Sequence, residues 1–136
     1  MGFVDAVKLC FARYATFTGR SARPEFWWWV LFSFLFNIVV GGLLTTIGGD
    51  WLGSLASLAL LVPSLAVGAR RLHDTGRSGW WQAAVYLPGA LSLLGGFFFM
   101  IGLIGMLVMI VLLIVWLLQP GEPGPNGYGV PPSALA

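Results

Sequence analysis

The sequence predicts an all-α membrane protein in which an N-terminal interfacial amphipathic helix precedes a bundle of four transmembrane helices, with three as the alternative. Of its 136 residues, 58% are hydrophobic and 9% are charged, and the mean hydropathy is +0.88. Soluble domains are about half apolar and about a quarter charged. Seven Trp and ten Phe point the same way, because aromatic rings collect at membrane interfaces. The length allows one domain, 1–136.

Residues 1–19 predict the interfacial helix. Its apolar side chains recur at alternating spacings of four and three, at Phe3, Val7, Cys10, Tyr14 and Phe17. Asp5, Lys8 and Arg13 lie elsewhere around the helix, which is therefore amphipathic and too charged to span. We expect it to lie in the headgroup plane, or to pack on the bundle, or both. Cys10, the only cysteine, is expected to be a small apolar residue on a helix face.

Uncharged stretches predict where the chain crosses the membrane, since about 20 apolar residues cover a core of ~30 Å. The expected spans are 26–47, 51–69, 80–97 and 99–118. Pro24 suits the first turn of the first span, and Glu25 is favoured by the helix dipole there. Pro63 should kink the second span, with Ser64 and neighbouring helices available to bond the freed carbonyl.

The division of the last apolar stretch into two spans rests on its length, because no charge occurs between Ser78 and Gly121. That length suits two crossings with a turn near Gly95 and Gly96. A shorter re-entrant piece at Pro88 and Gly89 is the alternative. Gly76 is expected to end the preceding helix and Ser78 to cap the next. The Pro- and Gly-rich tail, 120–136, should be irregular.

The basic residues predict the orientation. Lys8, Arg13, Arg20 and Arg23 precede the first span, and Arg70, Arg71 and Arg77 follow the second. Two crossings separate these groups, so both lie on one side, which the positive-inside rule makes the cytoplasm. The chain is then a multi-pass protein of a bacterial inner membrane with a cytoplasmic N-terminus. The turn at Asp50 lies outside, and the tail is cytoplasmic with four spans or outside with three.

Small and weakly polar side chains recur along one face of each of the first two spans. The expected helix-packing residues are Ser33, Asn37, Gly41, Gly53 and Ser57, continued by Thr45, Ser64 and Gly68. Helices in lipid associate through such faces. We therefore expect Leu in place of Gly41 or Gly53 to push the two helices apart. A polar pathway through the bundle is the alternative interpretation.

The composition disfavours several functions. Ionisable residues inside spans mark proton relays and ion-coupled transport, and the predicted spans contain none. The short basic segments make a poor footprint for nucleic acid. A zinc site needs three or four ligands, whereas His73 has only Asp74 nearby. No catalytic residue, metal site or cofactor is therefore predicted, and the chain is not expected to be an enzyme.

Three segments carry a resemblance to a known family. They are Gly-Arg-Ser-Ala-Arg-Pro-Glu-Phe-Trp at 19–27, Arg-Arg-Leu-His-Asp-Thr-Gly-Arg-Ser-Gly-Trp-Trp at 70–81 and Pro-Gly-Glu-Pro-Gly-Pro-Asn-Gly-Tyr-Gly at 120–129. They resemble the signatures of the uncharacterised membrane proteins catalogued as domain of unknown function 805. In that family an arginine usually precedes the closing aromatic residue, where this chain has Gly127. The resemblance implies an inner-membrane location and no known reaction.

The first two signatures are expected to meet at the cytoplasmic interface and form an anion- or partner-binding site. Its candidate residues are Arg20, Arg23, Glu25, Arg70, Arg71, His73, Asp74 and Arg77. Asp74 lies four residues after Arg70 and three after Arg71, spacings that would let it hold an arginine if the helix continues that far. Simple positive-inside anchoring is the alternative explanation of these charges.

The sequence thus predicts a non-enzymatic membrane module whose basic cytoplasmic face binds anionic lipid headgroups or a protein partner. The alternative is a small channel or transporter, formed by oligomerisation through the small-residue faces. An enzyme acting on a lipid has the least support, because it would rest on His73, Asp74 and Ser78 alone. Membrane lipids, a second copy of the chain or another membrane protein are the expected partners.

Overall fold

The computed structural model describes residues 2–132, and every regular element of that range is helical. The elements are α1 (Phe3–Ala12), α2 (Arg23–Thr46), α3 (Asp50–Asp74), the 3₁₀ turn η1 (Gly79–Gln82), α4 (Ala83–Ser92) and α5 (Gly96–Leu118). The predicted all-α class is confirmed. Position 1 of the predicted interfacial helix and positions 133–136 of the predicted tail lie outside the described residues.

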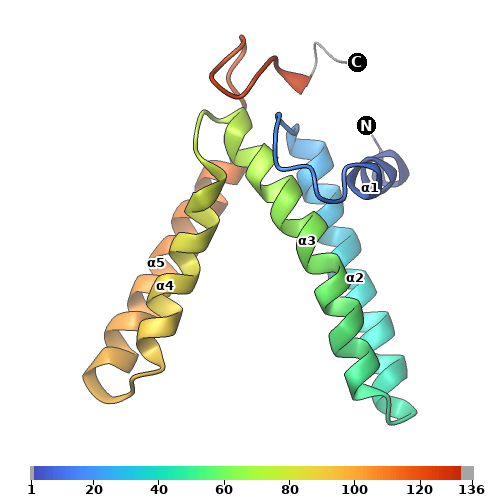
Figure 1. Ribbon diagram of the computed structural model, residues 1–136, viewed down its shortest axis with the longest axis vertical. Coiled ribbons are helices and arrows are strands. Elements are labelled where there is room, and N and C mark those ends of the chain that lie inside the picture. The colour runs from blue at the N-terminus through green and yellow to red at the C-terminus, as the bar shows by residue number, and fades with distance from the viewer. Residues whose placement is uncertain (1, 133–136) are drawn as a thin grey trace.

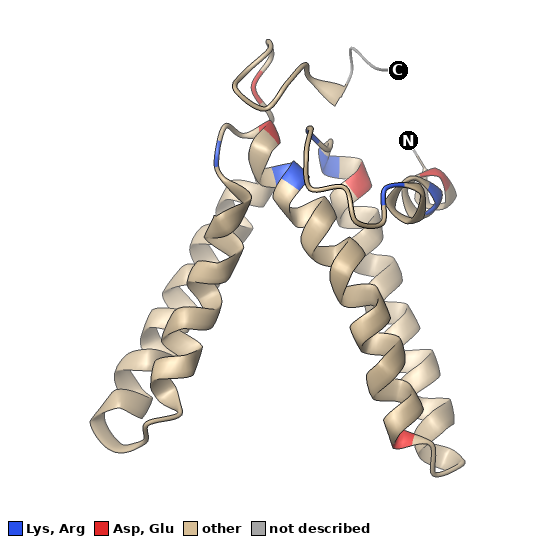
Figure 2. Ribbon diagram, in the orientation of Figure 1, with Lys and Arg blue, Asp and Glu red and all other residues tan. Residues whose placement is uncertain are grey.

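The helices form two antiparallel hairpins, α2–α3 and α4–α5, which diverge from one end of the molecule (Figure 1). Nearly all charged residues gather at the end where the hairpins meet, which we call the charged end (Figure 2). Asp50 begins α3 and so lies at the other end. Helix α1 crosses α2 near the charged end and is seen almost end-on in Figure 1. Its buried residues are Ala6 and Cys10, so α1 packs on the bundle.

Three of the described helices, α2, α3 and α5, are long and apolar enough to cross a membrane. The segment 80–97 differs from the predicted third span, because it consists of the end of η1, the ten-residue helix α4, a turn and the first two residues of α5. Ten residues of α-helix extend only ~15 Å. The helix starts late because η1 still lies against α3: a Cβ atom on Gly79 would be 2.6 Å from that of Ala69.

The structure confirms the local roles predicted for several glycine, proline and serine residues at helix ends, although α1 already ends at Ala12 within the predicted interfacial helix 1–19. Pro24 stands in the first turn of α2. Gly76 has a φ of 77° just after α3, which favours glycine, and Ser78 caps η1 by accepting a hydrogen bond from the Trp80 amide at 3.2 Å. The turn between α4 and α5 falls at Gly95 and Gly96, both with positive φ.

Helix α3 continues through Pro63, and a residue from outside the helix bonds the carbonyl that this proline leaves free. Proline lacks the N–H that would bond the carbonyl four residues earlier, which belongs to Ala59. The Tyr14 hydroxyl donates to that carbonyl. Ser64, the partner expected from the sequence, instead donates to the carbonyl of Leu60 at 2.6 Å. Ser64 also accepts from Trp29 Nε1 at 3.0 Å and so joins α3 to α2.

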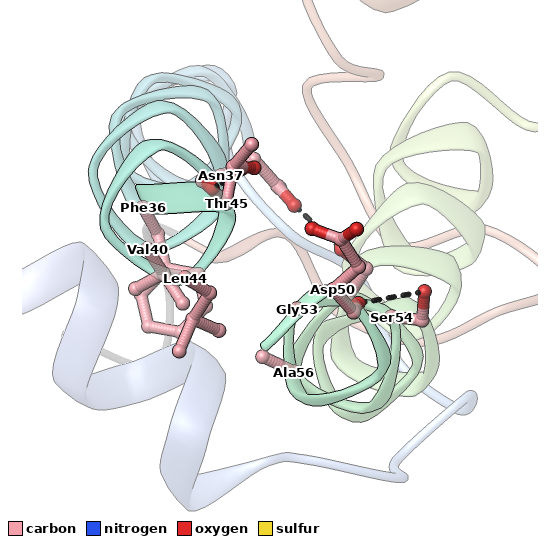
Figure 3. A pocket seen from close by; sticks show the side chains of 11 residues that line it. Phe36, Asn37, Val40, Leu44, Thr45, Asp50, Gly53, Ser54 and Ala56 are labelled. Atoms are coloured by element: carbon pink, nitrogen blue, oxygen red, sulfur yellow. Dashed lines mark hydrogen bonds between the residues drawn. The ribbon is translucent and has the colours of Figure 1, made fainter. Parts of the chain in front are cut away.

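The expected small-residue face of α2 and α3 is only partly a packing face. Ser57 Oγ donates to Asn37 Oδ1 at 2.7 Å. A Cβ atom on Gly53 would make ordinary contact with Leu44 at 3.7 Å, whereas one on Gly41 would meet nothing within 4 Å. A polar pocket of about 410 Å³ opens beside Gly41 (Figure 3). The expectation that Gly41 keeps the two helices close is therefore wrong.

A tight contact of a glycine with the backbone of a neighbouring helix occurs in the other hairpin, α4–α5, for which no packing residue was predicted. A Cβ atom on Gly102 of α5 would lie 2.6 Å from the backbone nitrogen of Ser92 in α4, and one on Gly105 would lie 3.1 Å from Pro88 Cβ. Small residues let helix backbones approach in this way. Gly102 is accordingly buried.

Candidate functional site

The three family-like segments meet at the charged end. The chain between α1 and α2 runs past the last turn of α3, where the Ser21 amide donates to the Arg70 carbonyl at 3.0 Å. The tail after α5 folds over the same turn, and the Glu122 amide donates to the Asp74 carbonyl at 2.8 Å. Segments separated by some 100 residues therefore enclose one cluster of charged side chains.

Asp74 lies at the centre of this cluster and pairs with two arginines. Its Oδ1 accepts from Arg20 Nε at 2.9 Å, and its Oδ2 accepts from Arg71 Nη1 at 2.8 Å. Both arginine side chains are fully buried, and the Asp74 side chain is 7% exposed. Helix α3 extends to Asp74, so the predicted contact at a spacing of three residues, with Arg71, is confirmed.

The remaining donors of Arg20 and Arg71 bind backbone carbonyls of the tail and of α5. Arg20 Nη1 donates to Gly124 at 2.8 Å and Nη2 donates to Glu122 at 2.5 Å. Arg71 Nε donates to Leu117 at 3.2 Å, and its Nη2 donates to Gln119. Because guanidinium offers several donors in a rigid fork, these two side chains hold the tail and the end of α5 on α3.

A second buried pair joins α2 to α3. Arg70 Nη1 lies 3.3 Å from Glu25 Oε1, with the arginine side chain fully buried and that of Glu25 2% exposed. Arg70 therefore pairs across helices and not with Asp74, which was the other contact that the spacing allowed. The Cys10 thiol of α1 donates to Glu25 Oε1 at 3.9 Å. Burial and the negative charge of Glu25 raise the pKa of Cys10 to about 12, so the thiol is inert at neutral pH.

His73 is held from two sides at the edge of the cluster. Its Nδ1 lies 2.9 Å from the carbonyl oxygen of Gly19, which can only accept, so Nδ1 carries the proton. Its ring stacks on Tyr128, with centroids 4.1 Å apart. The side chain of Asn126 donates to the His73 carbonyl at 2.9 Å. The histidine thus anchors the tail and the segment before α2.

The remaining two candidates lie outside this cluster. Arg23 is exposed and donates to the Leu118 carbonyl at 3.2 Å. Arg77 lies over the ring of Trp116, with its Cζ 4.6 Å from the centroid. All eight predicted residues are therefore at the charged end, but Arg20, Arg70 and Arg71 face inward and are bound to groups of the protein itself. The tail carbonyls that accept from Arg20 were not among the predicted site residues.

These features define a class, a multi-pass α-helical membrane protein whose charged end is closed by buried arginine–carboxylate pairs. The chain belongs to the family described as "Protein of unknown function (DUF805)", whose profile matches residues 14–130. The resemblance noted in the sequence is thereby confirmed.

Two Escherichia coli K12 relatives are named inner membrane proteins. YhaH is 35% identical over 89 residues, covering 55% of this chain and 67% of YhaH. YhaI is 35% identical over 77 residues, covering 55% and 65%. The uncharacterized protein YiiR of the same strain is 38% identical over 71 residues, covering 48% and 46%. The chain thus matches about two thirds of YhaH and YhaI. No solved structure matches it. With its three span-length helices, the chain is a multi-pass inner-membrane protein.

Proposed function

We propose that this chain is a non-enzymatic membrane module that binds anionic lipid headgroups through the outward-facing basic residues of its charged end. In this proposal the charged end lies at the cytoplasmic face of the membrane. The arginine–carboxylate cluster is the internal fastening that holds the two hairpins and the tail together. A protein partner with an acidic surface would be the competing occupant of the same face.

The observation that carries the proposal is a division among the basic residues. Arg20, Arg70 and Arg71 are buried in ion pairs, whereas Lys8 and Arg23 are exposed and form no ion pair with any residue between 2 and 132. The chain has seven basic and five acidic residues, and one of the acidic residues, Asp50, begins α3 at the end opposite the charged end. Without Asp50 the basic residues exceed the acidic ones by three, and Figure 2 shows the blue segments gathered at the charged end. Each basic group near an anionic leaflet contributes about 1 kcal/mol of attraction.

The double variant Lys8→Gln/Arg23→Gln tests this surface. We expect it to retain less phosphatidylglycerol than the wild type after extraction from mixed phosphatidylglycerol–phosphatidylcholine nanodiscs, measured by native mass spectrometry. Loss of two contributions of about 1 kcal/mol reduces the preference by at most roughly thirty-fold. The control Lys8→Arg/Arg23→Lys keeps both charges and should retain the lipid. Equal lipid retention by all three proteins would contradict the proposal and leave the protein-partner alternative.

Accessibility of inserted reporters tests the orientation. A reporter inserted after Asp50 should be active in the periplasm, and one inserted after Tyr128 in the cytoplasm, because the tail returns to the charged end and binds Arg20. A cytoplasmic signal from the reporter after Asp50 would contradict the proposed orientation and favour the opposite one. A periplasmic signal at Tyr128 would be incompatible with the observed contact between the tail and α3.

The alternative, an oligomeric channel or transporter, draws on the polar pocket between α2 and α3. Asn37 and Thr45 of α2 and Asp50 of α3 line it (Figure 3). Within one chain the pocket stops short of the charged end, because the apolar cluster that includes Trp29 and Leu60 lies on that side of it. Single-channel recording on the purified protein separates this alternative from the lipid-binding module.

A further inference from the structure

A second concave site lies where the two hairpins diverge, apart from the outward-facing basic residues. It is a half-open groove of about 730 Å³ between α3 and the segment 78–86, and Phe17 and Tyr128 also contribute to its lining. Pockets for small molecules commonly have volumes of about 300–1,000 Å³. The groove is therefore large enough for part of a lipid molecule.

The lining of the groove changes in character along its length. Its described lining residues include no Asp, Glu, Lys or Arg. The polar side chains of His73 and Ser78 lie toward the charged end, whereas Leu65 lies eight residues back along α3, or ~12 Å down the helix. Gln82 also lines the groove near Leu65, but its Nε2 already donates to the Leu65 carbonyl at 3.0 Å. Trp80 and Tyr86 add large rings, which are 83% and 61% exposed. A polar end and an apolar depth match an amphiphile.

The polar end of the groove offers one acceptor and one donor. His73 Nδ1 donates its proton to the Gly19 carbonyl, and in the Nδ1-protonated neutral tautomer Nε2 is an acceptor. Nε2 lies close to Gly79, another lining residue of the groove, because a Cβ atom built on Gly79 would be 3.6 Å from it. Ser78 Oγ accepts from the Trp80 amide and keeps its own proton to donate. A hydroxyl group can satisfy both.

We infer that the groove binds a neutral membrane lipid that carries a free hydroxyl beside its acyl chains, as diacylglycerol does. The hydroxyl lies at His73 and Ser78, and one acyl chain lies along Leu65, Trp80 and Tyr86. A phosphate group is disfavoured because the described lining residues offer it no Lys or Arg. The buried arginines of the charged end cannot serve it, since Arg20 and Arg71 already bind Asp74 and the tail.

Quenching by brominated lipids tests the inference. The protein is placed in phosphatidylcholine nanodiscs with equal small fractions of brominated diacylglycerol, brominated phosphatidylglycerol or brominated phosphatidylcholine. The Trp80 contribution is the difference between the wild type and Trp80→Phe. We expect saturable quenching of this component by the diacylglycerol, in excess of that by either phospholipid. Ala83→Phe, which narrows the groove, should abolish the excess, and Ala90→Phe, at an exposed position of α4, should not.

Competition keeps the test decisive if Ala83→Phe does not fold. Unlabelled diacylglycerol should relieve the quenching of wild-type Trp80, and unlabelled phosphatidylglycerol should not. Equal quenching by all three lipids would mean ordinary contact with bulk lipid and would overturn the inference. Preference for phosphatidylglycerol would overturn the neutral chemistry. Neither result bears on Lys8 and Arg23, whose double variant tests the proposed function separately.

Discussion

Asp74→Asn is expected to destabilise the protein severely, because one carboxylate neutralises two buried guanidinium groups. Breaking one buried ion pair by removing a partner typically costs about 3–5 kcal/mol. Here both Arg20 and Arg71 lose their counter-ion, and their side chains are fully buried. We therefore expect a loss at or above the upper end of that range, measured as the free energy of unfolding in mixed micelles.

The matched control is Asp5→Asn, which removes an exposed carboxylate at the same end of the molecule. Its effect should be small, since exposed charges contribute little to stability. Arg71→Lys should also destabilise the protein, because the lysine keeps the charge but cannot reproduce the hydrogen bonds from Arg71 Nε and Nη2 to the carbonyls of Leu117 and Gln119. If Asp74→Asn unfolds no more readily than Asp5→Asn, the cluster is not the fastening that the geometry indicates.

The sequence was most informative where one residue determines local structure. Pro24, Gly76, Ser78 and the pair Gly95–Gly96 each act through their own backbone or side chain, so the boundaries they mark could be predicted. The contact between Arg71 and Asp74 could be predicted for the same reason, because three residues of helix bring the side chains together.

Contacts between distant segments could not be predicted in this way. Arg20 Nη1 reaches the carbonyl of Gly124 across 104 positions, and carbonyl groups leave no trace in a sequence because every residue has one. The spacing of charges allowed Asp74 to pair with Arg70. Arg70 instead pairs with Glu25, because α2 packs beside α3 and brings this carboxylate to it. Three of the arginines that suggested an anion site, Arg20, Arg70 and Arg71, therefore form ion pairs inside the protein.

The length of α4 was missed because hydropathy does not record where a helix begins. The segment from Ser78 onward is as apolar as a span, yet its first residues form a 3₁₀ turn against α3. Gln82 Nε2 donates to the Leu65 carbonyl at 3.0 Å and holds this turn in place. Only tertiary contact with α3 determines that the α-helix starts at Ala83.

Gly102→Leu is expected to disrupt the α4–α5 hairpin, because the new side chain would collide with backbone atoms. A Cβ atom at this position would lie 2.6 Å from Ser92 N and 2.9 Å from Ser92 Cα, and closer still to the Pro88 carbonyl oxygen. Overpacking against side chains typically costs about 1–3 kcal/mol, and backbone atoms cannot move aside as side chains do. We expect a loss above that range and a lower yield of folded protein.

Gly41→Leu is the matched control for Gly102→Leu, since it makes the same change in a span-length helix where a Cβ atom would meet nothing within 4 Å. The added side chain can occupy the pocket between α2 and α3, which Gly41 lines, so the melting temperature of this variant should stay close to that of the wild type. Both variants are compared in one detergent by thermal unfolding. A greater loss for Gly41→Leu than for Gly102→Leu would place the tight helix contact in the α2–α3 hairpin and contradict the packing described above.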